Sequence, residues 1–144
     1  MQEVPINYLA VFVSAVAAMV VGFLWYGHLF GKMWADMMGY KFDTPEAKRE
    51  MQKKAMPGYI GSFIGALVMA YVLAHALVFA STYTGTYGIA AGLMVGFWNW
   101  VGFVAPVTVG IVFWEKKPWK LWFINASYWL VLLLVMGVIL AVWQ

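Results

Sequence analysis

The sequence contains no cysteine and very little charge. Only 10% of its residues are charged, whereas 65% are hydrophobic. The absence of cysteine excludes disulfides, thiolate nucleophiles, iron–sulfur clusters and zinc–thiolate sites. The scarcity of charge excludes a soluble domain of 144 residues, because too few polar side chains remain to cover its surface. We therefore expect a single integral membrane domain over residues 1–144.

The hydrophobic residues are collected into long runs. A bilayer core about 30 Å thick requires about 20 apolar residues in a helix that crosses it. The segments that meet this length are approximately 7–26, 58–80, 88–113 and 119–143. The sequence therefore predicts an all-α integral membrane protein, a four-helix bundle that crosses the bilayer with each of these segments.

Positive charge is confined to two connections between the runs. All nine Lys and Arg residues lie at positions 32–54 or 116–120. With four spans these connections share one side of the membrane, and the positive-inside rule assigns that side to the cytoplasm. Both termini are then expected on the outer side of the membrane. The membrane itself is expected to be the cytoplasmic (inner) membrane. Because the charge of +3 is accounted for by topology, we expect the lipid bilayer as a partner and no nucleic acid.

Aromatic residues near the ends of the runs agree with these spans and this orientation. Their amphipathic rings favour the depth of the lipid headgroups. We expect such a belt at the cytoplasmic side to include Trp25, Trp34, Trp114, Trp119 and Trp122. On this interpretation most of the nine tryptophans need no other explanation.

The cytoplasmic 27–57 connection is expected to be partly helical. Residues 29–40 place three methionines and a tryptophan on one helical face, which is typical of an interfacial helix. A loop wrapped over the end of the bundle is the alternative. The stretch 44–46, Thr-Pro-Glu, has the pattern of a helix start, with an N-cap, a proline and an early acid. It predicts a polar helix that ends near Met56.

Small residues recur every three or four positions on three of the four runs. In lipid, small side chains let helix backbones approach closely, so this spacing predicts helix-packing seams. The seam residues are Ser14, Ala18, Gly22, Ala66, Ala70, Gly92, Gly96 and Gly102. Gly61 and Gly65 lie alongside the seam of the second run. These seams predict a tight bundle that associates with itself or with another membrane protein, and they specify no activity.

One primary amide, that of Asn99, lies inside the third run between two tryptophans. On an ideal helix Asn99 falls close to one line with Gly92, Gly96, Gly102 and Pro106. Pro106 cannot donate a hydrogen bond to the carbonyl of Gly102, so we expect the helix to bend there and free an acceptor.

Depth along the helices predicts partners for this amide. We expect Asn99 to lie level with Tyr71 in the second run and with Ser127 and Tyr128 in the fourth. Two interpretations of this candidate polar network stay open. Interhelical hydrogen bonds of about 0.6–2 kcal/mol fix helix register, which is a structural role. Alternatively, the polar groups line a path for a solute or an ion.

The sequence shows no arrangement of residues with catalytic or metal-binding spacing. His28 and His75 are expected on opposite sides of the bilayer, so they cannot share a metal ion. No Asp or Glu accompanies either histidine inside the membrane. We therefore expect no enzyme activity, no catalytic residue, no cofactor and no metal. Each histidine is expected to be a hydrogen-bonding residue near the interface.

Aromatic motifs occur in three stretches: LWYGHLFGKMW (24–34), WVGF (100–103) and KPWKLWFINASYWL (117–130). With these motifs the chain resembles a family of small prokaryotic membrane proteins, domain of unknown function 1761. The chain departs from the family pattern at Gly27-His28, where Ser-Pro is expected. The resemblance implies four spans and a prokaryotic membrane. The family carries no agreed activity, so it supplies no catalytic residue.

These observations leave two functional hypotheses. The first is a non-enzymatic packing or accessory module that works as an oligomer or inside a larger complex. The alternative is a small transporter or channel with a polar path near Asn99 and Pro106, because a bent, glycine-rich helix with a polar group suits such a path. A continuous hydrated cavity that reaches Asn99 would distinguish the two.

Overall fold

The computed structural model describes residues 4–40 and 44–143. Within these ranges the regular structure is entirely helical. The helical stretches that are long and apolar enough to cross a membrane are Tyr8–Leu29, Met56–Thr84, Gly88–Phe113 and Trp119–Val142. The prediction of an all-α protein with four candidate spans is confirmed.

The first and third spans each contain a π-helical segment, which has a wider turn than an α-helix. In chain order the elements are α1 (Tyr8–Phe23), η1 (Leu24–Leu29), α2 (Gly31–Met38), α3 (Pro45–Lys54), α4 (Met56–Thr84), α5 (Gly88–Asn99), η2 (Trp100–Val104), α6 (Ala105–Thr108), α7 (Gly110–Phe113) and α8 (Trp119–Val142). The first span is therefore α1 with η1, and the third runs from α5 to α7.

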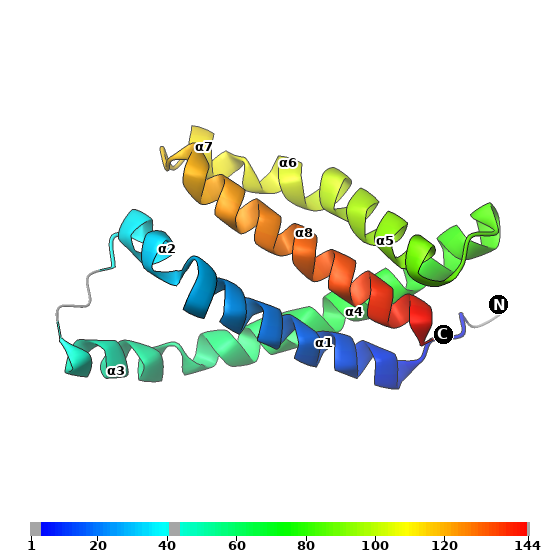
Figure 1. Cartoon of the computed structure of the whole chain (residues 1–144), viewed down its shortest axis with the longest axis horizontal. Helices are drawn as coiled ribbons and strands as arrows, with labels where there is room; N and C mark the ends of the chain where they lie inside the picture. The colour runs from blue at the N-terminus through cyan, green and yellow to red at the C-terminus, as the bar shows by residue number, and fades with distance from the viewer. Residues whose placement is uncertain (1–3, 41–43, 144) are drawn as a thin grey trace.

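Helix α8 lies between the other spans. It packs against α1, α4 and α5, and α4 packs in addition against α1 and α5 (Figure 1). The start of α1, the end of α8 and the α4–α5 connection lie at one end of the molecule (Figure 1). Helices α2, α3 and α7 lie at the opposite end (Figure 1). The described residues of the two basic connections therefore share one end.

The connection between the first two spans is partly helical, as the sequence predicts. Helix α2 occupies the stretch expected to form an interfacial helix, and it buries Ala35. Helix α3 begins with Pro45 at its first turn, and the hydroxyl of Thr44 accepts a hydrogen bond from the N–H of Ala47 at 3.2 Å. The hydroxyl satisfies a donor that a helix start leaves free.

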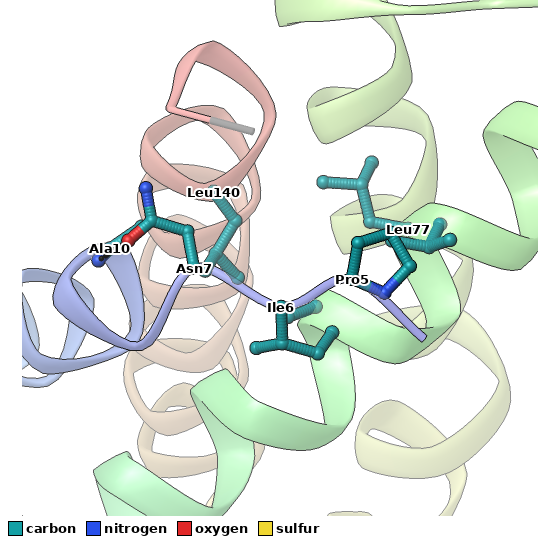
Figure 2. Close-up of a pocket in the computed structure, with 8 residues that line it drawn as sticks. Pro5, Ile6, Asn7, Ala10, Leu77 and Leu140 are labelled. Carbon is teal, nitrogen blue, oxygen red and sulfur yellow. Dashed lines mark hydrogen bonds between the residues drawn. The ribbon is translucent and has the colours of Figure 1, made fainter. Parts of the chain in front are cut away.

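The segment before α1 closes the end at which α1 begins. Pro5 and Ile6 lie around one small hollow together with Leu77 of α4 and Leu140 of α8 (Figure 2). They enclose a hollow of about 10 Å³, which is about the space that one water molecule needs. The amide of Asn7 donates to the carbonyl of Trp143 at 2.7 Å. This bond joins the first span to the last.

Small residues line the contacts between the spans. Ala66 and Ala70 of α4 are buried, as are Ser14 and Ala18 of α1. Gly92 and Gly96 of α5 are also buried, and they lie directly against the backbone of α8. A methyl group added at Gly96 would lie 2.6 Å from the carbonyl oxygen of Leu133, and one added at Gly92 would overlap the carbonyl of Gly137.

The substitution Gly92→Leu is expected to force α5 and α8 apart. It should lower the free energy of unfolding by about 1–3 kcal/mol, the usual cost of overpacking. Gly102→Leu is the matched control, because a methyl group added at Gly102 meets no atom within 4 Å. Thermal unfolding in detergent, followed by circular dichroism, measures both variants. Equal losses in the two variants would contradict the close helix contact.

Candidate functional site

The members of the predicted polar network, Asn99, Tyr71, Ser127 and Tyr128, make no hydrogen bond with one another in the part of the chain that the structure describes. The side-chain amide of Asn99 donates to the carbonyl of Val95 in its own helix at 2.9 Å. The hydroxyl of Ser127 likewise donates to a carbonyl one turn earlier in α8. The ring of Tyr71 is exposed and stacks on Tyr8 of α1, with ring centroids 6.4 Å apart. An interhelical bond between these residues is therefore not made.

A local acceptor explains this correction. Asn and Ser side chains readily bond the carbonyl one turn back, which requires no approach by a second helix. Depth along each helix also says nothing of the direction in which a side chain points.

Tyr128, the remaining member of the predicted network, packs its ring against Tyr26 with centroids 4.9 Å apart. A methyl group added at Gly22 would lie 3.3 Å from the Tyr128 hydroxyl.

The third span is interrupted immediately before Pro106, where the sequence predicts a bend. The interruption is η2, and its wider turn rotates the residues that follow relative to α5. Gly102 consequently leaves the face on which Gly92 and Gly96 pack, and nothing lies within 4 Å of a methyl group added there. The seam predicted through Gly102 therefore ends at Gly96, because the ideal helical period does not hold across η2.

Hydrogen bonds between helices converge instead on the first half of α8. The indole N–H of Trp25 in η1 donates to the carbonyl of Ile124 at 3.0 Å. The indole N–H of Trp100, the first residue of η2, donates to the carbonyl of Ala126 at 2.7 Å. Residues two apart in an α-helix are about 200° apart around its axis. The two indoles therefore hold α8 from opposite sides at nearly the same depth.

A tyrosine and an amide extend this arrangement. The hydroxyl of Tyr26 donates to the side-chain oxygen of Asn125 at 3.0 Å. The Tyr26 ring also contacts Trp34 of α2, with centroids 5.5 Å apart. We call Trp25, Tyr26, Trp100, Asn125 and Tyr128 the α8 clamp. The clamp joins η1, α2 and η2 to one stretch of the last span.

A second contact secures the end of the third span that lies nearest α7. The indole N–H of Trp122 donates to the hydroxyl of Thr108 at 3.2 Å. That hydroxyl donates in turn to the carbonyl of Val104, the last residue of η2, at 2.8 Å. The Thr108 side chain thus links Trp122 of α8 to the last residue of η2.

The histidines lie apart from the clamp. His75 of α4 places Nδ1 2.9 Å from the carbonyl oxygen of Tyr71. His28 of η1 packs edge-on against Phe23, with ring centroids 5.1 Å apart. Across residues 4–40 and 44–143, no three His, Cys, Asp or Glu side chains lie close enough together to hold a metal ion.

A second hollow opens on the surface of α1 and α8. Its volume is about 400 Å³, and its walls are the apolar side chains of Val13, Val138, Ile139, Val142 and Trp143. Neither this hollow nor the small one beside Pro5 is lined by Asn99. The walls of both are mainly apolar, and the arrangement suits contact with acyl chains better than binding of a charged solute.

The sequence interpretation did not select the clamp. It assigned Trp25 and Trp122 to an interfacial belt, whereas both donate hydrogen bonds to another part of the chain. The three aromatic motifs are the sequence feature that could have indicated the clamp. Stretch 24–34 supplies η1 and the first half of α2, stretch 100–103 lies in η2, and stretch 117–130 supplies the first half of α8. The motifs that carry the family resemblance are therefore the segments that meet at the clamp.

The substitution Trp100→Phe tests the clamp. It removes the indole donor to Ala126 and should lower the free energy of unfolding by about 0.5–1.5 kcal/mol, the net value of one hydrogen bond. Trp98→Phe is the matched control, since Trp98 is 63% exposed and lies two residues away. Chemical or thermal unfolding in detergent compares the two. A loss at Trp98 as large as that at Trp100 would argue against the clamp.

The family comparison agrees with these motifs. The family model described as "Protein of unknown function (DUF1761)" matches residues 9–141, which is nearly the whole chain and includes every clamp residue. No curated protein and no solved structure matches the chain. The chain belongs to the DUF1761 family.

Proposed function

We propose that this protein is a non-enzymatic membrane protein that works as a homo-oligomer and serves as a packing or accessory module. The observation that carries the proposal is a glycine face on α4. Gly58, Gly61 and Gly65 lie within about 60° of each other around the helix. A methyl group added at any of them meets no atom within 4 Å. We call these residues the α4 glycine face.

The α4 glycine face differs from the other small-residue seams. Gly92 and Gly96 already lie against α8, and Gly22 lies beside Tyr128, so those seams are used within the chain. A Gly-x-x-x-Gly spacing, present at Gly61 and Gly65, lets two helices approach at backbone distance in lipid. An unused face of this kind supports contact with another helix.

A second copy of the chain is the partner that we propose for this face. Residues 56–84 carry no Asp, Glu, Lys or Arg, so the contact depends on shape and not on opposite charge. Two copies related by a two-fold axis present the same face to each other, and one patch then serves both subunits. Val68 and Val72 continue the exposed face along α4 and provide ridges beside the glycines.

The proposal includes an orientation. The described residues of the two basic connections lie at one end of the molecule, opposite the start of α1 and the end of α8 (Figure 1). The positive-inside rule then supports a cytoplasmic location for the basic end, with both termini outside the inner membrane of a prokaryote. A reporter fused to either terminus, active only in the cytoplasm, should stay silent.

The substitution Gly65→Leu should weaken self-association without unfolding the chain. The leucine fills the α4 glycine face and keeps a second backbone at a distance. We expect native mass spectrometry in detergent to show a dimer or larger oligomer for the unmodified protein and at least tenfold less of it for the variant. Gly102→Leu is the matched control, because it places the same side chain at another open glycine. A purely monomeric unmodified protein would refute the proposal.

A transporter or channel is the second candidate, and the interruption of the third span is the observation that favours it. Broken helices with polar groups line many substrate paths. Asn99 directly precedes η2, and Pro106 follows it. The orientation of the Asn99 amide weighs against this candidate, because the amide already donates to Val95 in the same helix.

The substitution Asn99→Leu separates the two candidates. Under the packing proposal it removes only a bond within α5, so stability should change by less than about 1 kcal/mol and the oligomer should persist. Liposomes that contain the unmodified protein should be as tight to K⁺ and Cl⁻ as liposomes without protein. A flux that the unmodified protein supports and Asn99→Leu abolishes would favour the transporter.

A further inference from the structure

The third span contains a face that the observed structure uses only in part. On an uninterrupted α-helix Gly92, Gly96, Asn99, Gly102 and Pro106 fall within one face about 120° wide. In the structure Gly92 and Gly96 pack on α8, whereas Gly102 lies open. The difference arises within η2, because a π-helical turn acts like the insertion of one residue. The same residues therefore have two possible registers.

We propose that η2 is a register switch and that residues 105–113 occupy two rotational states. In the observed state residues 100–104 form the π-helix. In the second state they form a regular α-helix, which rotates residues 105–113 by about 100° around the span. Gly102 then returns to the face of Gly92 and Gly96. This switch is independent of self-association.

The contacts of the third span permit such a rotation. Trp100 is fixed to the carbonyl of Ala126, so the span is anchored up to the first residue of η2. Beyond that anchor Phe103 is 75% exposed and Val107 is 74% exposed. The hydroxyl of Thr108 accepts the hydrogen bond from Trp122 at 3.2 Å, and this bond is the latch that we assign to the observed state.

Pro106 and Gly102 favour opposite registers of the third span. In a regular α-helix Pro106 offers no N–H to the carbonyl of Gly102, and its ring crowds that carbonyl, so proline favours the π-helical state. Gly102 favours the α-helical state, because a glycine that faces α8 permits close backbone contact. Rotation also turns Thr108 away from Trp122. The switch would therefore loosen the 114–118 connection at the basic end of the molecule.

Pairs of spin labels can measure the rotation, because the chain contains no cysteine. Phe23→Cys in α1 and Val107→Cys form the reporting pair, and both positions are exposed. Phe23→Cys and Leu93→Cys form the control pair, since Leu93 precedes η2. Each labelled protein is diluted with unlabelled protein in liposomes, so that double electron–electron resonance reports distances within one chain.

Pro106→Ala and Thr108→Val should each move the reporting pair toward the α-helical state. A rotation of about 100° displaces a side chain by roughly 8 Å, given the width of a helix. Gly102→Leu should hold the π-helical state, because a leucine fits at Gly102 only where the site is open. The control pair should keep one distance in every variant.

The control pair decides how a result is interpreted. If it shifts in Pro106→Ala, that variant has lost its fold and Thr108→Val alone decides. A shift of the reporting pair with a constant control pair supports the switch, even if only one of these two variants produces it. One narrow distance for the reporting pair, unchanged in every variant whose control pair is constant, would overturn it.

Discussion

The contact between α5 and α8 at Gly92 and Gly137 is the constraint on which the arrangement depends. Each backbone lies so close to the other that a side chain fits on neither. In lipid the hydrophobic effect does not drive helices together, so dispersion between close backbones must supply the association. Because α8 also packs on α1 and α4, the α5–α8 pair determines where the other two spans can pack.

Polar groups in this protein bind backbone carbonyls much more than one another. Trp25 and Trp100 donate to carbonyls of α8, and Asn99 donates to a carbonyl of α5. The bilayer core contains no water to satisfy a donor, and a helical carbonyl has a second lone pair that can accept one. Trp25, which the sequence assigns to an interfacial belt, thereby becomes a contact between helices.

The sequence predicts properties that depend on composition and local pattern. The spans follow from run length and hydropathy, and the start of α3 follows from the Thr44 cap, which bonds Ala47 as expected. The partner of a polar side chain does not follow, since the Asn99 amide donates to Val95 in its own helix and not to the predicted residues of α4 or α8. Gly102 lies off its seam for a related reason, since extrapolation with 3.6 residues per turn fails across η2.

The bond between Asn7 and Trp143 has a consequence for the synthesis of this protein. It joins the start of the first span to the end of the fourth, which the ribosome makes later. The clamp acceptors, Ile124 and Ala126, also belong to the last span. While the ribosome is still producing α8, the first three spans must therefore wait in the bilayer without their main packing partner. The contacts among the four spans are completed only after α8 enters the membrane.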